Sequence, residues 1–159
     1  MLACRPVKAQ TQRLRPPGAL HEQVAQVVSC TRQTDLQELF AEARRDRQRL
    51  TLIGGQRSFG EHFLPTDASL GVDISALERG AVVKQTFADG RLLVRAGGGT
   101  RFEDLRAAFP EHRVRCVPTS DRITVAGALA ACAHSAAGYF ADSVQSFSLL
   151  TVQGETIEC

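Results

Sequence analysis

The distribution of apolar and polar residues predicts short strands separated by one amphipathic helix in the first half of the chain. Residues 24–29, 50–53 and 70–74 are short apolar runs of the length that strands have. Between the first two runs, apolar residues recur three and four positions apart from Leu36 to Ala43, which predicts a helix that opens at Thr34. Arginines crowd the end of this helix, where cations suit the helix dipole and are solvated.

The second half of the chain predicts a hairpin and two short helices. Residues 81–87 and 91–96 flank Asp89-Gly90, a pair typical of tight hairpin turns. Phe102, Leu105 and Phe109 predict a buried helical stripe that ends at Pro110. Thr124 can cap a small-residue helix over residues 125–130. Residues 114–117, 144–152 and 156–159 are predicted strands, the last two separated by a turn at Gln153-Gly154.

Two predicted helices also carry a T-x-x-Q or T-x-x-E pattern, which is typical of a capping box. Thr34 pairs with Gln37 in the first helix, and Thr100 pairs with Glu103 in the second. Strands and helices alternate irregularly and include at least one hairpin. This order favours an α+β fold over a doubly wound parallel sheet.

Length and composition restrict the class of protein. The 159 residues are 43% hydrophobic and 23% charged, as expected for one globular domain. No apolar stretch is long enough for a membrane span. The net charge of +2 gives no reason to expect nucleic acid as a partner. We expect residues 1–22 to be a basic, frayed N-terminal extension and residues 23–159 to be the folded domain.

The ends and the cysteines indicate a compartment. The N-terminal segment has no continuous apolar region, so we expect a cytoplasmic protein rather than a secreted one, with an organelle transit peptide left open. The five cysteines are scattered and form no CxxC pair, which fits neither a zinc site nor a disulfide framework. We therefore expect free thiols in a reducing compartment and no bound metal.

The strongest local feature is a glycine-rich segment that follows a predicted strand. Glycines at such a position let consecutive backbone N–H groups converge on an anion, and a diphosphate is the natural guest. Ser58 can add a hydroxyl donor and Arg57 a charge. The pattern is neither a Walker loop nor a dinucleotide-binding fingerprint, because no Gly-Lys-Ser/Thr follows and the GxGxxG spacing is missing. The segment comprises Gly54, Gly55, Gln56, Arg57, Ser58, Phe59 and Gly60.

A second segment, residues 118–135, combines hydroxyl groups, a predicted helix N-terminus at Thr124 and a lone histidine, His134. A helix N-terminus favours phosphate groups. A lone histidine is more often structural than functional, so the residue pattern alone leaves the role of His134 open.

Together these segments resemble a known family. The motif order is G-G-x-x-S-F-G, A-G-x-G, P-x-x-x-x-x-T-V-x-G-A, a histidine, and L-L-T-x-x-G-E. It resembles the FAD-binding domain of the vanillyl-alcohol oxidase and p-cresol methylhydroxylase (PCMH) type over residues 24–159. It is most similar to the sugar and polyol branch, such as the alditol oxidases and decaprenylphosphoryl-ribose oxidase. The resemblance implies two α+β subdomains that hold an extended FAD between them.

The resemblance also implies site residues. Residues 54–60 would wrap the pyrophosphate, and His134 with Ser135 would lie beside the flavin ring. Ile157 would give adenine a backbone contact. The approach to the pyrophosphate and ribityl chain would be made by Pro118, Thr119, Thr124 and Gly127. Many members carry a histidine that bonds covalently to flavin in the first glycine loop, where this chain has Arg57, so we expect non-covalent FAD.

Other departures from the family pattern lie near the flavin ring and at the end of the chain. The usual Gly-Gly pair after Thr-Val is Ala126-Gly127, and the glycine usual after His134 is Ser135. The family normally continues into a substrate domain that supplies the general base, and 159 residues leave little room for one. No catalytic residue is therefore assigned, and we expect a domain that is incomplete at its C-terminus.

Three hypotheses stay open at this point. The first is the flavin-binding part of an FAD-linked oxidoreductase that oxidises an alcohol such as a sugar or polyol by hydride transfer to flavin. The second is a non-catalytic, truncated flavin-binding or interaction module. The third is a free-standing FAD electron-transfer subunit that works with a separate catalytic chain.

Overall fold

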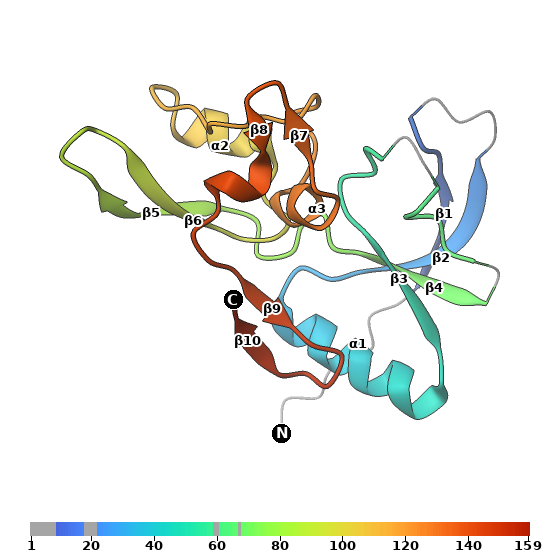
Figure 1. Cartoon of the computed structure of the whole chain (residues 1–159). Helices are drawn as coiled ribbons and strands as arrows, with labels where there is room; N and C mark the ends of the chain where they lie inside the picture. Colours follow the sequence, from blue (N-terminus) through green and yellow to red (C-terminus); the bar gives the residue numbers. More distant parts are fainter. Residues whose placement is uncertain (1–8, 18–21, 59–60, 67) are drawn as a thin grey trace.

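Strands β1 to β4 form a mixed four-stranded sheet in the first half of the chain (Figure 1). The computed structural model describes residues 9–17, 22–58, 61–66 and 68–159. The strand order is β1-β2-β4-β3. β1 and β2 are antiparallel, whereas β4 runs parallel to both of its neighbours. The four strands are Gln10–Leu14, Gln23–Ser29, Arg49–Ile53 and Ser69–Asp73.

Strand β1 corrects one expectation about the N-terminal segment. Gln10–Leu14 pairs along its whole length with β2, and Leu14 is only 1% exposed. Residues 10–14 thus belong to the sheet and are not a frayed extension. Four of the five residues of β1 are polar, so the sequence around Leu14 has no apolar pattern that predicts a strand. Pairing with β2 and burial of Leu14 hold it in place.

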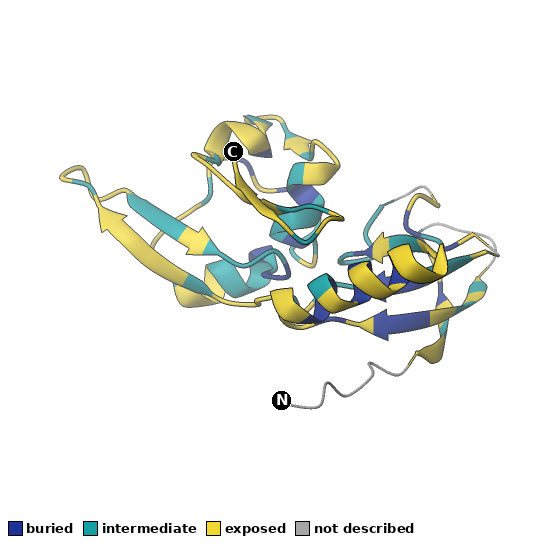
Figure 2. Cartoon of the chain, turned by 90° about the horizontal axis from the view of Figure 1, so that it is seen from below, coloured by how far each residue is buried: buried dark blue, intermediate teal, exposed yellow. Residues whose placement is uncertain are grey.

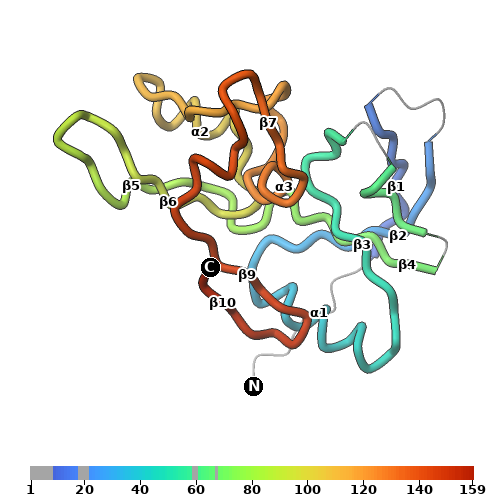
Figure 3. The backbone as a smooth tube through the Cα atoms, viewed as in Figure 1, coloured from blue at the N-terminus to red at the C-terminus, as the bar shows by residue number. Residues whose placement is uncertain are grey.

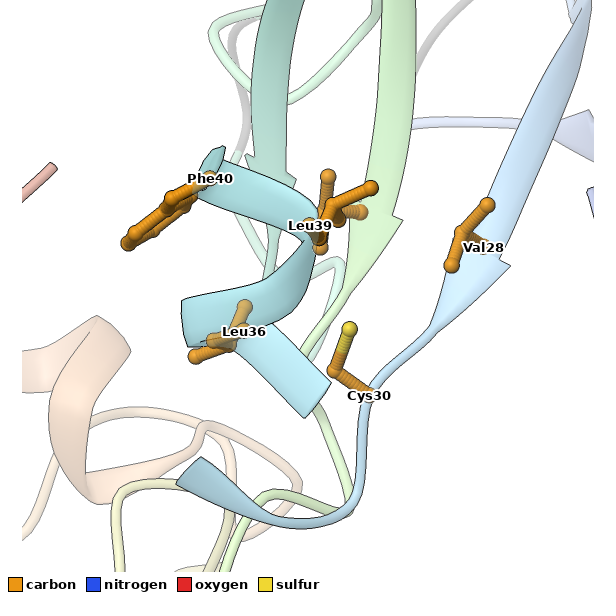
Figure 4. Packing of buried hydrophobic residues seen from close by; sticks show 6 residues of the cluster. Val28, Cys30, Leu36, Leu39 and Phe40 are labelled. Atoms are coloured by element: carbon orange, nitrogen blue, oxygen red, sulfur yellow. The ribbon is translucent and has the colours of Figure 1, made fainter. Parts of the chain in front are cut away.

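Helix α1, Gln33–Asp46, crosses from β2 to β3 and covers one face of the sheet (Figure 4). Leu36, Leu39 and Phe40 pack against Val28 and Val72, and each is at most 8% exposed. Burial of side chains of this size stabilises a fold by about 1.5–3 kcal/mol each. Figure 2 shows the result as a helix that is buried along one side and exposed along the other.

The opposite face of the sheet has its own core. Val27 directly precedes Val28 in β2, and its side chain therefore points to the other side of the sheet. It packs with Leu14, Ile53 and Phe63, all at most 7% exposed. Because both faces are covered, the parallel strands are short apolar runs, as the sequence predicts.

Neither predicted capping box is present. At α1 the carboxylate of Asp35 accepts hydrogen bonds from the backbone N–H groups of Thr31 and Arg32, at 3.2 and 3.0 Å. The Arg32 guanidinium beside it lowers the pKa of Asp35. The predicted partner of Thr34, Gln37, instead donates to the carbonyl oxygen of Gly154 at 2.9 Å.

The second box fails in the same way at α2, Phe102–Ala108. Asp104 accepts from the backbone N–H of Arg101 at 2.8 Å, and a salt bridge from Arg79 lowers the pKa of its carboxyl group. Thr100 is fully buried, and its hydroxyl exchanges two hydrogen bonds with the backbone of Gly80. It is therefore not free to cap the helix. In both helices an R-x-x-D pattern, and not T-x-x-Q/E, marks the first turn.

The second half of the chain builds a third core around a short helix. Phe102 and Phe140 meet edge to face with their rings 5.2 Å apart, and Cys116 and Ala128 complete the cluster. Hairpin β5–β6 projects away from this core, and β5 is largely exposed (Figure 2). The other elements here are β5 Ala81–Thr86, β6 Leu92–Ala96, α3 Val125–Ala130, β7 His134–Ser135, β8 Gly138–Tyr139 and the 3₁₀ helix Phe140–Ser143.

The C-terminal hairpin returns to the first half of the molecule (Figure 3). Strands β9, Ser148–Leu150, and β10, Thr156–Glu158, are antiparallel. Gln33 of α1 donates to the Thr156 hydroxyl at 2.8 Å. The predicted strand over residues 144–152 is shorter in the structure, because it covers only residues 148–150. The strand predicted over residues 114–117 is wrong, because these residues form no strand. The strands, helices and hairpin together confirm the α+β prediction.

Candidate functional site

The glycine-rich segment leaves the carboxyl end of β3. Ile53 is fully buried at the end of that strand, and its carbonyl oxygen accepts from Ile74 N–H at 2.9 Å. This pairing fixes where the segment starts. Gly54 to Ser58 are all half-buried and form the described part of the loop. Phe59 and Gly60, which were also predicted to bind the cofactor, lie outside the described residues.

The loop packs on the turn that precedes α3. A Cβ added to Gly54 would stand 3.0 Å from Thr124 Oγ1. A Cβ added to Gly55 would clash with the carbonyl oxygen of Arg122 and would stand 3.3 Å from Thr124 N. The main chains of two segments about 70 residues apart therefore touch here, and glycine is what permits it.

Thr124 is the fixed point of this junction. It is 2% exposed, and its hydroxyl accepts from Gly127 N–H at 3.2 Å, as the predicted cap requires. A backbone bridge to Arg101 and a bond from Val125 N–H to the Thr100 carbonyl hold it from the other side. The structure thus brings together Gly54, Gly55, Thr124 and Gly127. Nearby in sequence, Pro118 is buried and Thr119 is exposed.

Arg57 carries an unsatisfied side-chain atom among the residues that the structure describes. Its side-chain Nε is buried and makes no hydrogen bond, and the described residues offer its guanidinium no carboxylate within ion-pair distance. An unsatisfied buried donor costs about 1–3 kcal/mol, and a charged group costs more. A half-buried guanidinium with an unsatisfied Nε, beside half-buried glycine backbone, suits an anion such as phosphate.

The histidine segment is split between two faces of a small hairpin. Ser135 Oγ accepts from Ala137 N–H at 3.1 Å and lies 3.3 Å from the buried Cys116 Sγ, so Ser135 faces the third core. His134 is exposed, and its ring centroid lies 6.0 Å from that of Tyr139, the residue opposite it in the hairpin. Tyr139 was not among the predicted site residues.

Ile157 lies apart from the glycine loop. It sits on β10 opposite Leu149 and is 46% exposed. The hairpin that carries it is held to α1 through Gln33 and Gln37. The proposed adenine contact therefore rests on the resemblance alone.

Sequence reasoning missed a second arginine. Arg101 pairs with Thr124 through the backbone bridge, its side chain is 29% exposed, and its Nε is buried without a hydrogen-bond partner. Glu103 accepts one hydrogen bond from its guanidinium at 3.1 Å. The R-x-x-D pattern of α2 is the signal that could have placed Arg101 at this turn.

Other parts of the described surface are less suited to chemistry. A hollow of about 510 Å³ lies between the end of α1, β3 and Val152, with Phe40, Leu50 and Leu52 in its wall, and none of the residues 54–58 of the glycine loop lines it. Among the residues that the structure describes, no group of three His, Cys, Asp or Glu side chains could hold a metal ion. Helices long and apolar enough to cross a membrane are also missing from the described ranges.

A family comparison decides the identity of this arrangement. Residues 24–159 match the profile of a family described as FAD binding domain. The chain belongs to the FAD-binding domain family. The motif order that suggested the family spans the same residues. Curated proteins, in contrast, gave no match to this sequence.

Solved structures of flavin enzymes share the fold. A cholesterol oxidase from Brevibacterium sterolicum superposes with a TM-score of 0.69 at 18% identity, over 80% of this chain and 25% of its own. A VAO-type flavoprotein from Myceliophthora thermophila gives 0.70 at 17% identity, over 84% of this chain and 26% of its own. An alkyldihydroxyacetonephosphate synthase gives 0.68 at 17% identity, over 86% and 26%. The FAD-binding domain described here spans about a quarter of these structures and has the VAO and PCMH-type fold.

Proposed function

We propose that this FAD-binding domain holds FAD non-covalently and serves an FAD-linked oxidoreductase that oxidises an alcohol such as a sugar or polyol. The observation that carries the proposal is the buried Nε of Arg57, which has no hydrogen-bond partner among the described residues, next to the junction of the glycine loop and Thr124. A diphosphate would supply the missing partner, and the loop would supply backbone N–H donors. When bound, the flavin supplies the hydride-accepting chemistry.

The residues present fit such a cofactor. Gly54 and Gly55 keep side chains out of the junction with Arg122 and Thr124. Arg57 provides charge, and half-buried Ser58 provides a hydroxyl group. Thr124 and Gly127 fix the opposite wall. Pro118, which is buried, and Thr119, which is exposed, stay proposed contacts.

The chemistry of Arg57 supports the proposal of non-covalent binding. By resemblance this loop position carries the covalently linked histidine in many members, and a guanidinium cannot take its place as the attached nucleophile. The choice of a sugar or polyol rests on similarity of motif order to that branch. The residues that would contact such a substrate are not assigned.

Cofactor release and uptake test the proposal. Purified protein should be yellow, and acid or heat should release intact FAD into the supernatant, where chromatography identifies it. Stripped protein should take up FAD again, and ADP should compete because it carries the same diphosphate. Flavin that stays with the precipitated chain would contradict non-covalent binding. Protein that takes up no FAD would refute the site.

A matched pair of variants tests the loop itself. Gly55→Val would push the loop away from the Arg122 carbonyl oxygen and should abolish FAD uptake. Gly90→Asn is the control, since Gly90 is in the β5–β6 turn with open space around its Cα and a φ of +83° that asparagine tolerates. Equal FAD uptake by the two variants would place the diphosphate elsewhere. Flavin reduction by a panel of polyols then tests the substrate class.

A further inference from the structure

Hairpin β7–β8 separates a packed face from an open aromatic face. Ser135 and Gly138 face Cys116, whose Sγ lies 3.3 Å from Ser135 Oγ and 3.0 Å from the Gly138 carbonyl oxygen. His134 and Tyr139 are the alternate pair and point the other way, with ring planes at 59° to each other. Tyr139 is 58% exposed. Two adjacent, exposed aromatic rings call for an explanation, whereas a single one would not.

This aromatic face is held rigidly. Ala133 N–H donates to the Ala128 carbonyl, and Phe140 N–H donates to the Ala133 carbonyl, both at 2.8 Å. The Tyr139 N–H donates to Asp142 at 3.2 Å. Phe140, the next residue, is locked in the third core. The rings are thus presented by an ordered backbone, which lowers the entropic cost of binding a flat ligand.

The glycine-loop junction and the aromatic face lie at the two ends of α3. Thr124, just before the helix, contacts the glycine loop, and Ala128 near its end bonds to the hairpin. Six residues of helix rise about 9 Å. A ribityl chain separates a flavin ring from its first phosphate, so a diphosphate held at Thr124 can place the ring toward the hairpin. In Figure 1 β7 and β8 lie above α3, close to the end of that helix.

We propose that Tyr139 lies against the flavin ring and positions it, together with His134. This inference rests on the proposed FAD site and adds a residue to it. An aromatic ring contact of this kind contributes affinity beyond area burial alone. Tyr139 is also the single tyrosine of the chain, and the chain has no tryptophan.

Because the chain has one tyrosine and no tryptophan, flavin fluorescence can test the proposal. A phenol in contact with an excited flavin gives up one electron to it and takes the electron back, so emission is lost without net chemical change. Tyr139 is the only phenol available, and phenylalanine cannot act as such a donor. FAD bound by the wild-type domain should therefore have weak flavin fluorescence. The emission of Tyr139 itself should fall as FAD is added.

The experiment compares Tyr139→Phe, Tyr139→Ala and wild-type domain at saturating FAD. Tyr139→Phe keeps a ring, so its Kd for FAD should stay close to that of the wild type while bound flavin becomes severalfold brighter. Tyr139→Ala should show the same brightening and a Kd raised about 3–10-fold. Phe147→Leu is the control, because Phe147 is an aromatic residue 41% exposed outside the hairpin, and it should change neither property.

The outcomes separate the two proposals. If wild type and Tyr139→Phe bind FAD and are equally dim or equally bright, Tyr139 does not touch the ring, and this inference falls while the FAD site stands. If wild-type domain takes up no FAD, both fall. A brightening of Phe147→Leu equal to that of Tyr139→Phe would show a non-specific effect and would also overturn the inference.

Discussion

Replacement of Arg57 by methionine should affect stability and FAD affinity in opposite directions. Methionine keeps a long side chain in the loop but has neither charge nor the buried Nε donor. In the FAD-free protein that donor has no partner, and an unsatisfied buried donor costs about 1–3 kcal/mol. Because Arg57 is only half-buried, the gain should be near the lower end, so the free energy of unfolding should rise by about 1 kcal/mol.

The same change should weaken FAD binding. A hydrogen bond to a charged group contributes about 1.5–3 kcal/mol, which corresponds to a Kd raised about 10–100-fold. The Kd of Arg57→Lys for FAD should lie between those of the wild type and Arg57→Met, because lysine keeps the charge but lacks the forked guanidinium geometry. Urea unfolding of FAD-free protein gives the first quantity, and titration with FAD gives the second.

Arg44→Met is the matched control for charge, because Arg44 lies on α1 away from the loop. It should leave both quantities nearly unchanged. The reasoning is refuted if Arg57→Met lowers the stability of the FAD-free protein, or if its FAD affinity equals that of Arg44→Met. The first outcome would mean that the guanidinium is structural. The second would mean that no anion binds beside it.

Three further outcomes follow from the fold. Asp35→Asn removes the acceptor at the start of α1 and should lower the free energy of unfolding by about 1–2 kcal/mol in urea, with Glu42→Gln on the exposed side of the helix as a neutral control. The lowered pKa values of Asp35 and Asp104 contribute stability that is fully present above an unfolded-state pKa of about 3.9. That stability is lost as the pH falls through the folded pKa values, so an acid melt that is flat below pH 4 would contradict these ion pairs. Burial, followed by the charges of Asp35 and Asp73, raises the pKa of the Cys30 thiol to about 11, so a thiol reagent followed by mass spectrometry should label exposed Cys132 in the native protein and leave Cys30 unlabelled until unfolding.

Local pattern predicted the regular elements of this fold well. Residues 24–29, 50–53 and 70–74 are strands within one residue at either end, and Asp89-Gly90 is the turn of a hairpin. These elements depend on the apolar period and on turn chemistry, which are local. The cap at Thr124 was predicted correctly, whereas the two capping boxes were wrong. The hydroxyl of Thr100, for example, bonds to the backbone of Gly80, and no local pattern carries that information.

The candidate site was predictable in its parts but not in its assembly. The cap at Thr124 and the glycine loop were both found from sequence, whereas their contact depends on the path of the chain between them. Arg57 could be named as a charge, but that it lacks a partner is a property of the folded surroundings. Tyr139 was missed because a single aromatic residue has no periodicity to mark it.

The contact of Gly54 and Gly55 with the turn before α3 affects how the protein unfolds on heating. Gly55 brings main chain against main chain and Gly54 brings main chain against the Thr124 hydroxyl, so this contact between the sheet and the third core involves mostly polar atoms. Contacts of this kind define shape and contribute little energy. The two parts should then unfold as separate cooperative units when the cofactor is removed. A ligand that spans both would couple them, and calorimetry would show two overlapping transitions merging into one at higher temperature as FAD is added.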